Sequence, residues 1–237
     1  QPEPARPHPT LYLTLDIAPD YGRGATCGAL DQAGPFLDWV RSDRVPVTAF
    51  VSGQILDAGH SILDRLVSAG ISVELHGFSH TADVYGTMHT SHAGEIRNGT
   101  EAYVRRFNRP PAGYRAPAGV ISADDLALLA QLGYRYDASI FPMRRPGRFN
   151  FSSLPRHPFR WAGLELTEFP VGLLTSRIPA GLTFTNILGP ALSAFLVARA
   201  TAPAGAPFVL DAHLHNLYSY APALNALPLP IRWVYRI

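Results

Sequence analysis

Two histidines four residues apart, His76 and His80, are the residues of this sequence best suited to metal chemistry. They follow the run from Gly70 to Leu75, where we expect a strand to end in a turn or a helix. On a helical turn, side chains at positions i and i+4 lie on one face, so both imidazoles could bind one ion. Catalytic zinc sites commonly have three protein ligands and an open position for water. The same spacing also occurs in surface or capping histidines, so the interpretation depends on further ligands.

Further polar side chains stand where other strands are expected to end. The segment from Leu11 to Ile17 alternates between apolar and polar residues, which predicts a strand with a carboxylate near its end. Later segments bring another carboxylate, two histidines and, in a Pro/Gly-rich loop, an arginine. The residues concerned are Asp16, Arg115, Asp137, His213 and His215. The other histidines have no partner pattern, and we expect them at the surface: His8, His60, His89, His92 and His157.

Strands and helices alternate along most of the chain. The residue pattern predicts strands at 11–17, 45–51, 71–75, 134–140, 164–171 and 208–214. Helices are predicted at 36–44, 55–69, 91–107, 122–132 and 190–200, and 143–160 is expected to be a long loop. Such alternation is typical of an α/β fold with parallel strands and crossover helices. Because functional side chains gather at the carboxyl ends of parallel strands, we expect these residues to form one site.

Composition narrows the classes of protein. We interpret the 237 residues as a single domain, 1–237, with an extended lead-in at 1–9 and a C-terminal covering segment at 221–237. All 20 basic residues are arginine, which excludes a Schiff-base lysine, and their scattered positions do not indicate nucleic-acid binding. The single cysteine, Cys27, excludes an intrachain disulfide and a cysteine-based zinc site. The chain begins at Gln1 rather than Met, so export, a membrane tether and a cytoplasmic location all stay open.

Taken together and in order, the motifs resemble the polysaccharide deacetylases of the NodB-homology type, carbohydrate esterase family 4. The matching segments are Thr14-Leu-Asp16, 45–53, His76-Gly-Phe-Ser-His80, 113–119, 133–142, Glu168-Phe-Pro170 and His213-Leu-His215. The resemblance covers roughly residues 10 to 220. It implies a distorted (β/α) barrel of about seven parallel strands that binds one divalent metal ion, most often Zn²⁺, with Co²⁺, Ni²⁺ or Mn²⁺ as alternatives.

One departure concerns the third metal ligand. In the family, a second acid usually follows the base of the first motif directly or two places on, but here those positions hold Ile17 and Ala18. The next acid is Asp20, and a turn at Pro19 could bring its carboxylate to the metal beside His76 and His80. Two alternatives stay open: Asp16 binds the metal and the base lies elsewhere, or two histidines bind it weakly in a degenerate site.

The resemblance also implies roles for the remaining residues. Asp16 would act as general base, oriented by Arg115. His215, with His213 as second choice, would protonate the leaving amine, and Asp137 would hydrogen-bond that histidine. Tyr114 or the backbone near it could hold the oxyanion.

We therefore expect a metal-dependent hydrolase that removes N-acetyl or other acyl groups from an amino sugar, with a polysaccharide or glycolipid glycan as substrate. The arginine-rich segment 143–160 favours an anionic or extended substrate. Alternatives are an amide or cyclic-imide hydrolase acting on a small molecule, and a non-catalytic barrel that binds a glycan or a protein. The set of candidate catalytic residues argues against the last, since a pure binding protein does not need it.

Overall fold

A computed structural model describes residues 10–22, 26–80, 92–201, 207–218, 220–229 and 232. Its main feature is one eight-stranded sheet with the order β10-β1-β2-β3-β4-β5-β9-β8. The strands are β1 (Leu11–Ile17), β2 (Val47–Val51), β3 (Ser72–Leu75), β4 (Gly113–Tyr114), β5 (Tyr136–Asp137), β8 (Phe159–Arg160), β9 (Thr167–Glu168) and β10 (Phe208–His213). A separate antiparallel pair is formed by β6 (Arg144–Arg145) and β7 (Phe149–Asn150).

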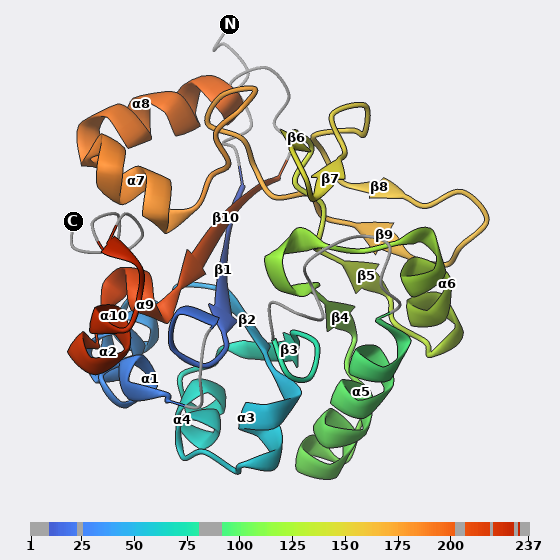
Figure 1. Ribbon diagram of the computed structural model, residues 1–237, viewed down its shortest axis with the longest axis horizontal. Coiled ribbons are helices and arrows are strands. Elements are labelled where there is room, and N and C mark those ends of the chain that lie inside the picture. Colours follow the sequence, from blue (N-terminus) through green and yellow to red (C-terminus); the bar gives the residue numbers. More distant parts are fainter. Residues whose placement is uncertain are drawn as a thin grey trace, which may run out of the picture.

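The helices surround this sheet (Figure 1). They are α1 (Gly28–Asp31), α2 (Gly34–Asp43), α3 (Gly53–Asp57), α4 (Ile62–Ser68), α5 (Ala93–Phe107), α6 (Ala123–Gln131), α7 (Leu182–Leu188), α8 (Pro190–Thr201), α9 (Leu214–Leu217) and α10 (Ala221–Asn225). Two short 3-10 helices, η1 (Asp20–Gly22) and η2 (Pro117–Gly119), follow β1 and β4. Among the described helices, none is both long and apolar enough to cross a membrane.

Seven strands run parallel, from β10 through β1 and β5 to β9, and β8 is antiparallel to β9. Beyond β9, isolated parallel bridges join Val171 to Val209 and Gly181 to Asp211, so the chain returns to β10 at the opposite edge. The sheet therefore curls toward closure. This arrangement confirms the expected distorted barrel of about seven parallel strands.

The core explains the pattern of the central strands. In β1, Leu15 and Ile17 are fully buried in the main apolar cluster, together with Val51 of β2 and Leu75 of β3. Strands buried on both faces are typical of parallel sheets covered by helices. The polar residues of β1 that alternate with them, Thr14 and Asp16, are buried too, so β1 carries polar groups into the barrel.

Several element predictions differ from the structure in extent. The helix expected over 55–69 is two helices, α3 and α4, because Gly59 adopts a positive φ of 60° between them. The expected strand 134–140 is ordered as a strand only at β5, and the expected loop 143–160 contains the β6–β7 pair and β8. In the C-terminal segment, α10 lies against η1 and buries Leu224, while the lead-in 1–9 lies outside the described residues.

Candidate metal and catalytic site

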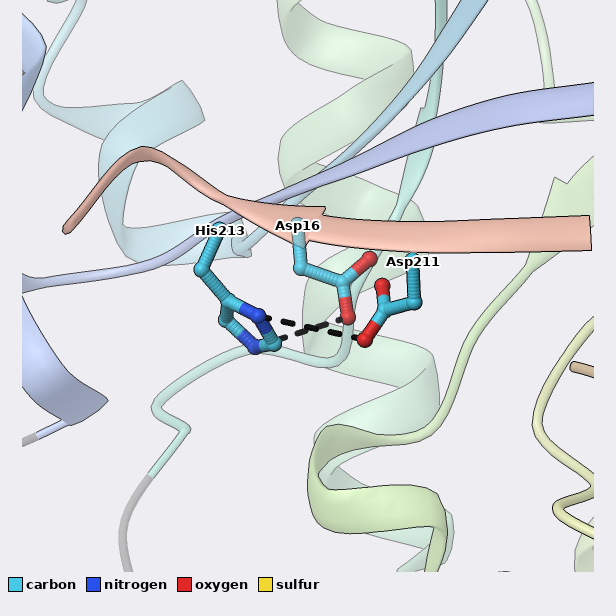
Figure 2. Close-up of side chains that lie close together, drawn as sticks. All are labelled: Asp16, Asp211 and His213. Carbon is cyan, nitrogen blue, oxygen red and sulfur yellow. Dashed lines mark ion pairs between the residues drawn. The ribbon is translucent and has the colours of Figure 1, made fainter. Parts of the chain in front are cut away.

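The carboxyl ends of β1 and β10 bring three side chains together. The two strands are parallel neighbours whose register pairs Thr14 with Asp211 and Asp16 with His213. Figure 2 shows the side chains of Asp16, Asp211 and His213 converging. Ligand atoms from these three residues all lie within 4.8 Å of one another, which is close enough for one metal ion. Pairing of the two strands therefore builds this part of the site.

Arg115 is the buried cation of the site, with a relative exposure of 1%. Its NH1 donates to Asp16 Oδ1 at 2.9 Å, to Asp211 Oδ1 at 2.8 Å and to Thr14 Oγ1 at 2.8 Å, and its Nε donates to the Ala138 carbonyl. Burial alone would raise the pKa of Asp16, but above all the charge of Arg115 outweighs it and holds that pKa below its usual value. Asp16 is thus ionised and fixed in orientation.

His76 follows β3 directly, and its hydrogen bond fixes its tautomer. Nδ1 lies 2.8 Å from the backbone oxygen of Arg115, which can only accept, so Nδ1 carries the proton. The lone pair of the neutral ring is therefore on Nε2, which is buried, has no hydrogen-bond partner and lies 3.6 Å from Asp16 Oδ2. Burial lowers the pKa of His76, although Asp16 opposes this, so the ring is neutral and able to bind a metal.

His80 reaches the same place by a turn rather than a helix. The residues between the two histidines have no helical hydrogen bonds, and Gly77 and His80 adopt positive φ values of 64° and 53°. The two imidazole centroids are 5.0 Å apart, and His80 Nδ1 is buried without a hydrogen-bond partner among the described residues. Burial above all lowers the pKa of His80 to about 3. Two neutral imidazoles thus lie next to each other, and His76 Nε2 is the nitrogen of the pair that lies 3.6 Å from Asp16 Oδ2.

The two late histidines differ in position. His213 ends β10, keeps 31% of its side-chain exposure, and places Nε2 3.9 Å from Asp16 Oδ2 and Nδ1 3.9 Å from Asp211 Oδ2. His215 was expected on the same strand, but the strand ends at His213 and His215 belongs to α9. There its ring lies 4.7 Å from the ring of Tyr21, and burial lowers its pKa well below the usual value. His213 therefore has the more direct contact with the carboxylates.

Asp20 is buried, but both its carboxylate oxygens are used in another way. Oδ2 accepts from the backbone N–H of Gly28 at 2.8 Å and Oδ1 from that of Ala29 at 3.0 Å. These are N–H groups at the start of α1, which have no partner within the helix. Asp20 thus anchors the loop after β1 to α1, although it also borders the site's pocket.

Asp137 lies at the end of β5, fully buried, and its hydrogen bonds do not reach the late histidines within the described residues. It accepts from Ser139 Oγ at 2.6 Å and from the Ser139 backbone N–H at 3.3 Å. Burial raises its pKa, and burial together with the Asp137 charge raises that of Glu168 well above its usual value. Asp137 and Glu168 form a buried acid pair behind Arg115 that the sequence analysis had not connected.

Asp211 is a functional candidate to which the sequence analysis gave no role. It is buried, donates nothing, and accepts from Arg115 while it faces His213. Burial and the neighbouring charge of Asp16 raise its pKa to about 6. The available signal was its position two residues before His213, which places both side chains on one face of a strand.

Two other expectations need correction. His92 was expected at the surface, but it is buried and its Nδ1 lies 2.8 Å from Asp125 Oδ2, in the capping box of α6. Tyr114 or the backbone near it was considered for the oxyanion; the Tyr114 ring is fully buried in the apolar cluster and packs edge-on against Tyr134, while Ala118 and Gly119 of the following loop line the pocket. His60 and His157 are at least partly exposed, while His8 and His89 lie outside the described residues.

A pocket of about 440 Å³ opens onto these groups. Asp16, Asp211, His80 and His213 line its polar side, and aromatic residues such as Phe141 line its apolar side. The pocket thus gives a ligand access to the carboxylates of Asp16 and Asp211 and to the imidazoles of His80 and His213.

The family model described as "Polysaccharide deacetylase" matches residues 3–136, which is more than half of the chain. The chain belongs to the polysaccharide deacetylase family. This bears out the resemblance on which the sequence analysis relied. The coarse assignment of a deacetylase-type carbohydrate esterase therefore rests on both sequence and fold. No curated protein matches this deacetylase-family chain.

Solved structures support the same fold for this polysaccharide deacetylase family member. A candidate polysaccharide deacetylase from Mycobacterium smegmatis is 20% identical with a TM-score of 0.65, covering 100% of this chain and 85% of the other. Puue allantoinase is 13% identical with a TM-score of 0.60, covering 94% and 83%. A carbohydrate esterase family 4 pseudoenzyme from Bacillus anthracis is 13% identical with a TM-score of 0.52, covering 87% and 56%. At these identities the likeness shows the fold alone.

Proposed function

We propose that this polysaccharide deacetylase family member is a metal-dependent hydrolase that removes an N-acetyl or other acyl group from an amino sugar of a polysaccharide or glycolipid glycan. The observation that carries the proposal is the pair of buried nitrogens, His76 Nε2 and His80 Nδ1, for which the described residues offer no hydrogen-bond partner. An unpaired polar atom in a buried position is costly unless a ligand satisfies it. The carboxylate of Asp16 beside His76 supplies the negative charge that a cation needs.

The proposed donor set has the chemistry that a divalent ion needs, although the described ligand atoms that lie within 4.8 Å of one another are those of Asp16, Asp211 and His213. His76, His80 and Asp16 would hold it, since imidazole nitrogens and a carboxylate oxygen are common zinc ligands. When bound, such an ion would lower the pKa of a water molecule and polarise the acyl carbonyl. The hydrogen bond from His76 to the Arg115 carbonyl would fix the ring for binding, as partners of metal-binding histidines usually do. A second candidate set, Asp16, Asp211 and His213, shares only Asp16 with the first.

The other polar groups suit the proton transfers of hydrolysis. Asp211 faces the pocket beside His213 and would take the proton from the attacking water. His213, within 3.9 Å of both carboxylates, would give a proton to the leaving amine nitrogen. Arg115 would fix the orientations of Asp16 and Asp211, because its NH1 group donates to both carboxylates.

This assignment differs from the sequence-based one in four roles. Asp211 replaces Asp16 as the general base, because it faces the pocket beside His213. Asp20 gives way to Asp16 as metal ligand because both of its oxygens accept backbone N–H groups. His215 gives way to His213 because it lies in α9 beside Tyr21. Asp137 would have a structural role in the core behind Arg115 and would not contact the acid histidine, since it accepts its hydrogen bonds from Ser139.

The test is acyl release from N-acetylglucosamine oligosaccharides by the protein loaded with Zn²⁺ or Co²⁺. His213→Gln should lower kcat by about 10²–10⁴-fold, the usual contribution of a general acid, while His215→Gln should have a smaller effect. His157→Gln, an exposed histidine away from the pocket, is the matched control. A larger loss in His215→Gln than in His213→Gln would overturn the assignment of the acid.

Two competing functions have their own outcomes in this assay. Hydrolysis of small cyclic imides but of no acylated sugar would favour the amide or imide hydrolase. Binding of glycans without release of an acyl group, with either of these metals, would favour a non-catalytic barrel. That alternative is supported by Ile17, which stands where the family usually has an acid.

A further inference from the structure

Three arginines border the same pocket as Asp16 and His213, and the proposed mechanism uses none of them. Arg145 and Arg148 come from the β6–β7 pair, and Arg177 comes from the chain that returns from β9 to β10. Arg145 and Arg177 are exposed and Arg148 is half-buried, so all three lie at the solvent side of the pocket. Segments far apart in the sequence thus converge to make one positive rim.

The two segments that carry the rim contain no acidic residues. Residues 138–164 contain five arginines and no Asp or Glu, and residues 169–210 contain two arginines and no Asp or Glu. Within the described part of the chain, neither Arg148 nor Arg177 forms an ion pair. The acids that line the pocket already accept hydrogen bonds: Asp16 and Asp211 from Arg115, and Asp20 from α1. The guanidinium groups of Arg148 and Arg177 are therefore available to a ligand.

The rim is also held in place by its backbone. The Arg148 N–H donates to the Arg145 carbonyl in the turn between β6 and β7. The Arg177 N–H donates to Thr175 Oγ1, inside a turn in which the Leu174 N–H bonds the Ile178 carbonyl. Both side chains thus start from defined turns, which limits the conformational entropy lost when they bind a ligand.

We propose that Arg148 and Arg177 bind an anionic group on the substrate, so that the preferred substrate is an acidic glycan with a carboxylate or phosphate near the acylated sugar. This inference rests on the proposed function, since it takes the pocket to hold a glycan. Guanidinium groups match the planar oxygens of carboxylate and the tetrahedral oxygens of phosphate through paired hydrogen bonds. Because both segments contain arginines and no acids, their net positive charge would also attract an anionic chain toward the pocket.

Direct binding tests this without the need for turnover. Calorimetry would compare chitotetraose, which is neutral, with a hyaluronan tetrasaccharide, which carries carboxylates, and with N-acetylglucosamine 1-phosphate. The measurements would be made on metal-loaded and on metal-depleted protein, because an anion could otherwise bind the metal itself. We expect at least one anionic ligand to bind about tenfold more tightly than chitotetraose in both forms, and less tightly as salt is raised.

The variants Arg148→Gln and Arg177→Gln should each weaken binding of the anionic ligand by about tenfold and leave chitotetraose binding unchanged. Arg144→Gln is the matched control, since Arg144 is an exposed neighbour on β6 that does not line the pocket. The ligand whose affinity depends on the rim identifies the anion as carboxylate or phosphate.

Equal affinity for neutral and anionic ligands, or equal losses in Arg144→Gln and the rim variants, would overturn the inference. Hydrolysis of chitotetraose with no dependence of binding on the rim would contradict this inference alone. Binding that depends on the rim, without hydrolysis of any acylated sugar, would support the inference and contradict the proposed function.

Discussion

Replacing Arg115 by Met should destabilise the protein strongly, because it removes the guanidinium that donates to two buried carboxylates. The side chain of Arg115 is 1% exposed and donates to Asp16, Asp211, Thr14 and the Ala138 carbonyl. Methionine keeps the aliphatic part of the side chain but lacks the guanidinium, whose carbon lies 4.5 Å from the centroid of the Phe50 ring. The change therefore removes the charge, its hydrogen bonds and this cation–π contact together.

The magnitude follows from the cost of leaving a buried charge without its partner. Breaking a buried pair in this way typically costs about 3–5 kcal/mol. Since small proteins unfold with about 5–15 kcal/mol, Arg115→Met should lose a large part of its stability but still fold in most conditions. Urea unfolding in the presence of a chelator, at a constant m-value, measures the loss without a contribution from metal binding.

Arg105→Met is the matched control, because Arg105 pairs with Asp57 at 2.9 Å but is 58% exposed. That exposed pair should contribute no more than about 1 kcal/mol. The double variant Arg115→Met, Asp211→Asn should be less destabilised than the sum of the two single variants, since one buried charge is gone. A loss in Arg115→Met no larger than that in Arg105→Met would refute this account of the site.

Two further predictions concern acids whose roles the structure redefines. Burial and the charge of Asp137 raise the pKa of Glu168, so its contribution to stability is present at low pH and lost as pH rises through that raised pKa. Glu168→Gln should lessen this loss in thermal melting between about pH 5 and pH 10, and parallel curves for the two proteins would disprove it. Asp20→Ala should cost about 1–2 kcal/mol in urea unfolding, because two N–H groups of α1 lose their acceptor. An unchanged stability would show that Asp20 does not anchor α1.

Much of the fold could be predicted from local pattern. The alternation in residues 11–17 indicated β1 with the bounds observed, and the helix expected over 122–132 is α6, with Ser122 as its N-cap. Both signals are local, since one depends on a two-residue period and the other on a side chain three residues from its partner. The order of the motifs then indicated the barrel.

What the sequence did not reveal depends on contacts between distant segments. The short strands β4, β5 and β9 are stabilised by pairing with their neighbours rather than by their own propensity, so their lengths cannot be predicted from the local sequence. Asp211 gains its importance only because the register of β10 with β1 brings it to Arg115. The sequence did not reveal that both carboxylate oxygens of Asp20 are already used. Its N–H partners lie eight and nine residues further along the chain, at the start of a four-residue helix.

The central claim is that His76, His80 and Asp16 hold a divalent metal ion. Elemental analysis after supplementation and dialysis tests it most directly, on the wild-type protein beside His76→Ala, Asp16→Ala, Asp20→Ala and His213→Ala. The account predicts near one equivalent of metal in the wild type, in Asp20→Ala and in His213→Ala, and its loss in the other two variants. No metal in the wild type would contradict the claim. Loss in Asp20→Ala with retention in Asp16→Ala would move the third ligand to Asp20, and loss in His213→Ala with retention in His76→Ala would move the ion to the carboxylate pair.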